Sequence, residues 1–271
     1  MLVGLGALAV GVLGQFTHAT RRPELLTVDA RFSVRGAQPP PDDVVLVGVD
    51  GQTLSTLGVR PPLPRRLHAK AIDVLRRDGA RAIAYDFQFT QPSTATDDDR
   101  LITAVGRAGG VVLATTTVDE RGRTTVLGGE ETLRELRAVA ATSNFPPRTA
   151  RGGIIRRIPY EDLGIASFPV AAARAATGRA PDHAQFAGDG AWIDFAGPAG
   201  TIPTISFSDL IAGKVSPEKI RGKVVVVGAT DPIIQDIHPA STGPGMPGPE
   251  IQANAIATIL NGFPLREAGW W

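Results

Sequence analysis

Three runs of nearly uninterrupted apolar residues, rich in β-branched and small side chains, constrain the fold of this chain most strongly. They span residues 44–49, 80–87 and 223–227. Apolar runs of this length are typical of strands that are buried on both faces of a parallel sheet. Because helical patterns separate the runs, we expect right-handed crossovers between the strands. The sequence therefore predicts an α/β fold with a mostly parallel sheet and helices on both faces.

Helix signals fill the intervals between these strands. Pro64 opens an amphipathic segment that stops before Gly79, as expected for proline at the start of a helix and glycine after its end. Further helices are expected at residues 101–108, 132–141, 168–177, 206–212 and 250–260. Further strands are expected at residues 111–116 and 191–195, with a looser strand pair over residues 143–162.

The first 20 residues contain no Asp, Glu, Lys or Arg and consist mainly of Leu, Val, Ala and Gly. A helix of about 20 residues spans the roughly 30 Å hydrocarbon core of a bilayer. We therefore predict one N-terminal transmembrane helix over residues 1–20, with a cleaved signal peptide as the alternative. The charged, Pro-rich residues 21–42 indicate a linker, and residues 43–262 form the predicted folded domain. Residues 263–271 end in Trp270-Trp271, a pair typical of a membrane interface or of an ordinary apolar terminus.

Charge and residue counts disfavour several classes of function. With 28 Lys and Arg against 27 Asp and Glu, the chain has no strong positive field that would hold a nucleic acid. Cysteine is absent, which excludes disulfides, thiolate metal sites and a Cys nucleophile. The four histidines are scattered without a pair at i, i+4, so a His-based metal site is not expected. The run Gly228-Ala229-Thr230 matches neither common phosphate-binding loop, and we predict no cofactor.

Polar side chains follow three of the predicted strands at their carboxyl ends. Asp50 ends the first strand, Asp86 lies near the end of the second, and Thr230 follows the last. Ligands of open parallel sheets bind outside these strand ends, so this edge is the predicted pocket. The alternative for each carboxylate is to cap the following helix or turn. Residues 97–99, three consecutive aspartates, are expected at a helix N-terminus rather than around a cation.

One segment suggests an enzyme. Residues 82–90, AIAYDFQFT, resemble the first motif of haloacid-dehalogenase-type phosphatases, an apolar strand followed by Asp-x-Asp-x-Thr. Gln88 stands at the second Asp of that motif and cannot transfer a proton at neutral pH. A hydrolase with Asp86 as nucleophile is therefore an alternative interpretation. A membrane scaffold that holds partners or dimerises without a small ligand is another.

Four blocks between residues 43 and 262 resemble the second type of CHASE domain, the extracytoplasmic sensory module of bacterial cyclases and kinases. Where the family has GxWPWPR followed by HA, GAxxIxxDxxF and DGxxRRxP, this chain has similar stretches in the same order. They read PLPR and HA within residues 43–69, GARAIAYDFQF at 79–89, GIIRRIP at 153–159, and IRGKVVVVGAT and EIQANAI within 220–256. The sequence departs from the family pattern at several positions. Pro61 and Leu63 replace two tryptophans, no Asp precedes Gly153, and Gln252 stands where His is usual.

The resemblance implies a sensor at the cell membrane with its main domain outside the cytoplasm. It implies one membrane helix before the domain, further helices after residue 271, and an output module that this chain does not contain. We expect an unidentified small-molecule or protein ligand and no catalytic module, and a homodimer fits this layout. The predicted ligand-binding residues are Asp50, Asp86, Arg157, Thr230, Asp236 and Asn254.

The support for these six residues differs. Asp236 and Asn254 are predicted mainly from the resemblance, whereas the strand-end residues are predicted from their position. Arg157 has an alternative structural role, in which it pairs with a carboxylate and orders a sheet edge. Glu250 and Asn254 are four residues apart, so we expect them on one face of a helix.

Overall fold

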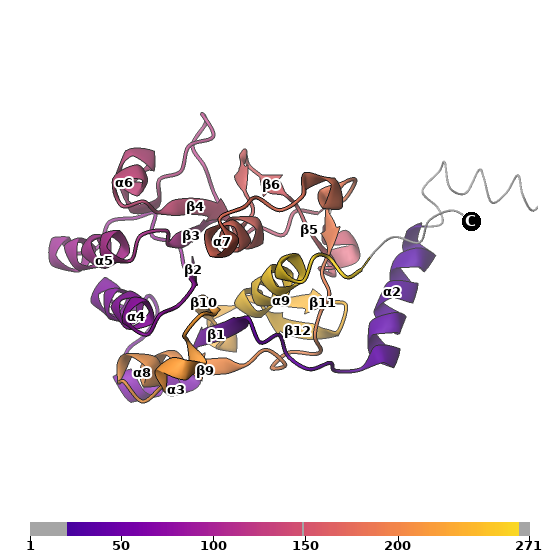
Figure 1. Ribbon diagram of the computed structural model, residues 1–271, viewed down its shortest axis with the longest axis horizontal. Helices are drawn as coiled ribbons and strands as arrows, with labels where there is room; N and C mark the ends of the chain where they lie inside the picture. The colour runs from indigo at the N-terminus through magenta and orange to yellow at the C-terminus, as the bar shows by residue number, and fades with distance from the viewer. Residues whose placement is uncertain (1–20, 148, 266–271) are drawn as a thin grey trace, which may run out of the picture.

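The computed structural model describes residues 21–147 and 149–265. Its centre is a six-stranded sheet in the order β4-β3-β2-β10-β1-β9, in which all neighbouring strands are parallel. The strands are β1 (Val44–Val49), β2 (Ala82–Asp86), β3 (Val112–Thr115), β4 (Val139–Thr142), β9 (Thr204–Ser206) and β10 (Val224–Ala229). The predicted α/β fold with a mostly parallel sheet is confirmed (Figure 1).

Helices cover both faces of this sheet (Figure 1). The first face is covered by α3 (Gly51–Leu57), α4 (Arg65–Arg77), α5 (Ala95–Ala108), α6 (Glu130–Glu135) and α8 (Phe207–Ile211), and the second by α7 (Phe168–Thr177) and α9 (Gly248–Leu260). Alternate residues of β1 and β10 belong to the two hydrophobic cores, so their β-branched side chains are buried on both sides. This double burial is why the central strands lack the polar alternation of an exposed sheet.

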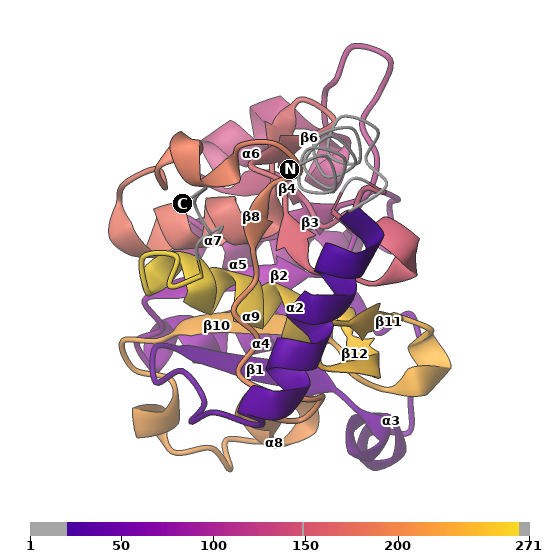
Figure 2. The same ribbon diagram turned by 90° about the vertical axis from the view of Figure 1, so that its right-hand side faces the viewer.

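A third hydrophobic cluster covers the outer side of α9 and is built mostly from short elements. Its core includes Phe32, Ile193, Phe195, Ile259 and Phe263. The short strands are β5 (Arg157–Ile158), β6 (Glu161–Asp162), β7 (Ile165–Ala166), β8 (Ala191–Trp192), β11 (Ile237–Ala240) and β12 (Gly243–Pro247). The short 3-10 helices are η1 (Val126–Gly128), η2 (Arg151–Gly153), η3 (His183–Phe186), η4 (Pro217–Lys219) and η5 (Pro232–Ile234). Helix α2 (Arg21–Arg35) packs on this cluster and crosses in front of α9 in Figure 2.

Predicted segments differ from the structure in several places. The strand predicted over residues 191–195 ends at Trp192, and in place of the strand pair predicted over residues 143–162, β5 pairs with β8 and β6 with β7. The helix predicted over residues 132–141 ends at Glu135, and Arg137 adopts a left-handed φ of 53°. The chain then forms β4, because pairing with β3 overrides the helix preference of its alanines. Within the predicted linker, residues 21–35 form α2, since Phe32 buries its ring in the third cluster.

The transmembrane helix predicted over residues 1–20 and the Trp270-Trp271 pair lie outside the described residues. None of the helices in residues 21–147 and 149–265 combines the length and the apolar character that a membrane span requires.

Candidate functional site

The carboxyl ends of three central strands meet at one edge of the sheet. Strand β10 lies between β2 and β1, so Asp86, Thr230 and Asp50 follow three adjacent strands. In the sequence β10 follows both β1 and β2, but in the sheet it lies between them. The order of the strands therefore changes direction at this point. A crevice at such a switch is where open parallel sheets bind ligands.

Two glycines let other groups approach this edge closely. Gly48 of β1 and Gly228 of β10 are paired in register. A Cβ added to Gly228 would lie 2.6 Å from Cβ of Pro249, and one added to Gly48 would lie 3.0 Å from Cγ2 of Thr230. The first turn of α9 therefore rests directly on β10, and Thr230 packs over the backbone of β1.

Asp86 and Asp236 lie beside this first turn of α9. Cβ of Asp86 is 3.3 Å from the position of a Cβ on Gly228, and Cγ of Asp236 is 2.7 Å from that of a Cβ on Gly248. Burial and, to a smaller extent, the negative charge of Asp236 raise the pKa of Asp86 to about 8, and a hydrogen bond with Ser143 opposes the shift. Since two nearby carboxylates resist double ionisation, Asp86 holds its proton near neutral pH.

Further polar and aromatic groups surround the two carboxylates. Nε2 of His238 lies 2.9 Å from Oδ1 of Asp236, and the rings of His238 and Phe145 are 5.3 Å apart. Gln252 of α9 donates a hydrogen bond from Nε2 to the carbonyl oxygen of Ser143 at 3.1 Å. We call Asp86, Asp236, His238, Ser143 and Phe145 the strand-end cluster.

The sequence did not predict three members of this cluster. Ser143 and Phe145 follow β4, whose sequence was interpreted as the end of a helix, so their position at a strand end was hidden. His238 lies on the hairpin of β11 and β12, which was not predicted, although it follows Asp236 by only two residues.

Asp50 has a structural role at the same edge. Its Oδ1 accepts hydrogen bonds from the backbone N–H of Thr53 at 2.7 Å and from Oγ of Ser206 at 3.0 Å. Asp50 is thus the N-cap of α3, which is the capping alternative for a carboxylate at a strand end.

Arg157 and Asn254 lie away from the strand-end cluster. Arg157 is on β5, where its guanidinium stacks on Trp192 with Cζ 3.7 Å from the ring centroid. Asn254 is buried in α9 and accepts a hydrogen bond from the backbone N–H of Ala196 at 2.9 Å. Asn254 and Glu250 share one face of α9, as predicted, since both contact the segment between β8 and β9.

The model of the CHASE2 domain family matches residues 5–271 of this chain. The chain belongs to the CHASE2 family. CHASE2 is a family of sensory domains that are typically extracellular, which supports a signal-input role. Neither the curated proteins nor the solved structures include a match to the chain.

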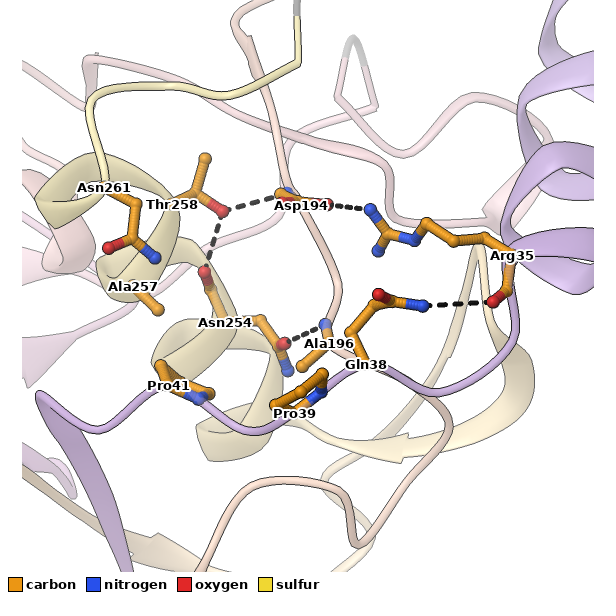
Figure 3. A pocket seen from close by; sticks show the side chains of 10 residues that line it. All are labelled: Arg35, Gln38, Pro39, Pro41, Asp194, Ala196, Asn254, Ala257, Thr258 and Asn261. Atoms are coloured by element: carbon orange, nitrogen blue, oxygen red, sulfur yellow. Dashed lines mark hydrogen bonds and ion pairs between the residues drawn. The ribbon is translucent and has the colours of Figure 1, made fainter.

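The CHASE2 domain also has a small pocket between its N-terminal and C-terminal elements (Figure 3). The pocket has a volume of about 90 Å³ and lies between α9, residues 35–41 and the segment around Asp194. Asn254 lines it, but both atoms of its side-chain amide already bond within the protein, to Ala196 and to Glu250.

The described part of the CHASE2 domain contains no group of three or more His, Asp or Glu side chains placed to hold a metal ion. The aspartates of residues 97–99 are in the first turns of α5, as predicted for a helix N-terminus. Two of them form ion pairs with α4, Asp98 with Arg65 at 2.8 Å and Asp97 with Arg66 at 3.0 Å. This acidic run therefore joins two helices.

Proposed function

We propose that this CHASE2 domain is the extracytoplasmic signal-input domain of a bacterial membrane receptor and that it binds its ligand at the strand-end cluster. The apolar composition of residues 1–20 supports attachment to the membrane, and the family to which the chain belongs supports a position outside the cytoplasm. The observation that carries the binding site is the pair of carboxylates, Asp86 and Asp236, against the first turn of α9.

The chemistry of the cluster favours a ligand with an organic cation, such as an amine. A positive charge between the two carboxylates would stabilise ionised Asp86, and the ring of Phe145 adds an aromatic face for a cation. The described residues offer too few ligands for a metal ion at this place. Binding of an amine near neutral pH would therefore release a proton from Asp86.

The same geometry argues against the alternative of a hydrolase. A carboxyl group that is protonated at neutral pH is a poor nucleophile, and the pKa of Asp86 is about 8. Gln88, at the position of the general acid in the phosphatases, accepts a hydrogen bond from Oγ1 of Thr116 at 3.0 Å. We infer that the domain has no catalytic activity of its own.

A thermal-shift titration of the full chain with methylammonium chloride at pH 8 tests the site. Sodium chloride at equal ionic strength is the reference, because it screens charges without offering an amine. An amine at 100 times its dissociation constant stabilises the folded state by about 2.7 kcal/mol, so wild type should melt at a higher temperature.

Variants locate the effect. Asp86→Asn and Asp236→Asn should each lose most of the stabilisation, whereas Asp99→Asn, an exposed carboxylate on α5, should respond like wild type. An equal response of Asp86→Asn and wild type would contradict the proposed site. The location is tested separately: protease added outside intact spheroplasts should cleave the domain, and full protection would contradict an extracytoplasmic position.

A further inference from the structure

Helix α9 carries a buried polar stripe between the apolar faces that it presents to the second and third hydrophobic clusters. Glu250, Asn254 and Thr258 follow each other at intervals of four residues, and each is at most 2% exposed. Their side chains accept hydrogen bonds from the backbone N–H groups of Gly200 (2.8 Å), Ala196 (2.9 Å) and Asp194 (2.9 Å), respectively. Side chains of α9 therefore hold the segment of residues 194–200 in place, whereas a strand in a sheet is held by backbone hydrogen bonds.

Helix α2 holds the same segment from its other side. Nη1 of Arg35 lies 2.6 Å from Oδ1 of Asp194, and Nη2 of Arg35 donates to the carbonyl oxygen of Phe195. The ring of Phe32 packs edge-on against Phe195, with 5.8 Å between centroids. Figure 3 shows Arg35, Asp194 and Thr258 in one line, with Asp194 bonded to both neighbours.

A second anchor joins α2 to the strand beside this segment. Asp29 of α2 forms a two-point ion pair with Arg156, at 2.9 Å to Nε and 2.5 Å to Nη2. Arg156 is only 4% exposed, and its carbonyl oxygen accepts a hydrogen bond from the N–H of Ile193 at 2.9 Å. The segment of residues 193–196 is thus fixed to α2 by ion pairs, through Arg156 and at Asp194, and by aromatic packing at Phe195.

We propose that residues 193–196, here the coupling segment, transmit a change in the position of α9 to α2. Helix α9 begins at the strand-end cluster with Gly248 and Pro249, and its last turns hold the coupling segment. The coupling segment in turn holds α2, the element that follows residues 1–20 in the chain. The direction of the signal rests on the proposed function, whereas the coupling between the two helices does not.

The polar contacts of the coupling segment are suited to transmitting a change in the position of α9. Hydrogen bonds and ion pairs have discrete arrangements, so a small shift of α9 either keeps or breaks the bond between Thr258 and Asp194. The pocket of about 90 Å³ separates residues 35–41 from α9 near this bond. Direct packing across this gap is therefore incomplete, and the path through Asp194 carries more of the coupling.

Hydrogen exchange of the full chain without any ligand tests the coupling. Thr258→Val removes the acceptor for the N–H of Asp194 but keeps the shape of the side chain. We expect amides in residues 25–35 of α2 to exchange at least five-fold faster, although Thr258 is on another helix. Thr177→Val is the matched control, since Thr177 makes the same bond to the carbonyl four residues earlier, at 2.8 Å, and its other side-chain hydrogen bonds go to the backbone of Arg179.

Amides of β10 report whether the variant has lost its fold. If they remain protected and α2 exchanges at the wild-type rate in Thr258→Val, the proposal is wrong. If β10 also exchanges faster, Asp194→Asn, which weakens the ion pair at a partly exposed position, replaces Thr258→Val and must show the same acceleration in α2. Because no ligand is added, failure of the amine titration leaves this test intact, and failure here leaves the proposed binding site intact.

Discussion

Replacement of Asp86 by Asn should change how the stability of the domain depends on pH. The pKa of Asp86 is raised from 3.8 to about 8, mainly by burial. Between these values the folded state holds one proton more than the unfolded state, so stability falls as pH rises. Each pH unit in this window removes up to about 1.4 kcal/mol from the free energy of unfolding.

His68 acts in the opposite direction at lower pH. Burial lowers its pKa from 6.5 to about 4, within hydrogen-bond distance of Tyr85 at 2.9 Å. Between pH 4 and 6.5 the folded state therefore holds one proton fewer at His68, and stability rises with pH there. The two effects offset each other below pH 6.5, and the effect of Asp86 stands alone between pH 6.5 and about 8.

Between pH 6.5 and pH 8 the free energy of unfolding should fall by about 1.5 to 2 kcal/mol, which is an upper limit because the carboxylate of Asp86 is only partly buried. Urea unfolding of the full chain at pH 6.5 and pH 8, at constant ionic strength, measures it. Wild type and Asp99→Asn should both lose this stability, and Asp86→Asn should lose little of it. If Asp86→Asn loses as much stability as wild type, the carboxyl group does not hold its proton in the folded state.

Other substitutions test the contacts that position the site and α2. Gly228→Ala places a methyl group against Pro249 and should destabilise the domain by about 1 to 3 kcal/mol in urea unfolding; no loss would show that α9 does not rest on β10. Arg156→Ala leaves Asp29 without its partner and should cost about 3 kcal/mol, the low end for a buried pair because Asp29 is partly exposed. A double variant with exchanged charges should recover part of that loss, and no recovery would mean that the ion pair of Asp29 and Arg156 does not help to hold α2. In an Asp86→Asn background, the stability should rise from pH 4 to pH 6.5 as His68 of the unfolded chain loses its proton, and a flat profile would contradict a neutral buried imidazole in the folded state.

The sequence predicted those parts of the fold in which burial alone determines the structure. The runs at β1, β2 and β10 are apolar on both faces, and only a covered parallel strand accommodates such a pattern. Strand β4 was missed because its alanines suit a helix, and only its partner β3 makes it a strand. Strand β9 is three residues long and has no periodic signal of its own.

The candidate site could be predicted only where sequence position implies spatial position. Asp86 ends a strand, and parallel strands bring their carboxyl ends together, so its place at the edge was predicted. His238 is brought to Asp236 by a hairpin, and Ser143 is brought to Asp86 by a strand whose alanines suit a helix, and no local pattern reveals either contact. Arg157 stacks on Trp192 of β8 and Asn254 bonds to the segment between β8 and β9, because long-range packing of short elements directs them there.

Proton release on amine binding tests the central claim most directly. Calorimetric titration of the full chain with methylammonium chloride at pH 7, in two buffers of different ionisation enthalpy, counts the protons released. We expect wild type to release close to one proton per bound amine and Asp86→Asn to bind weakly and release none. Binding without proton release, or an equal release by Asp86→Asn, would contradict a ligand site at the strand-end cluster.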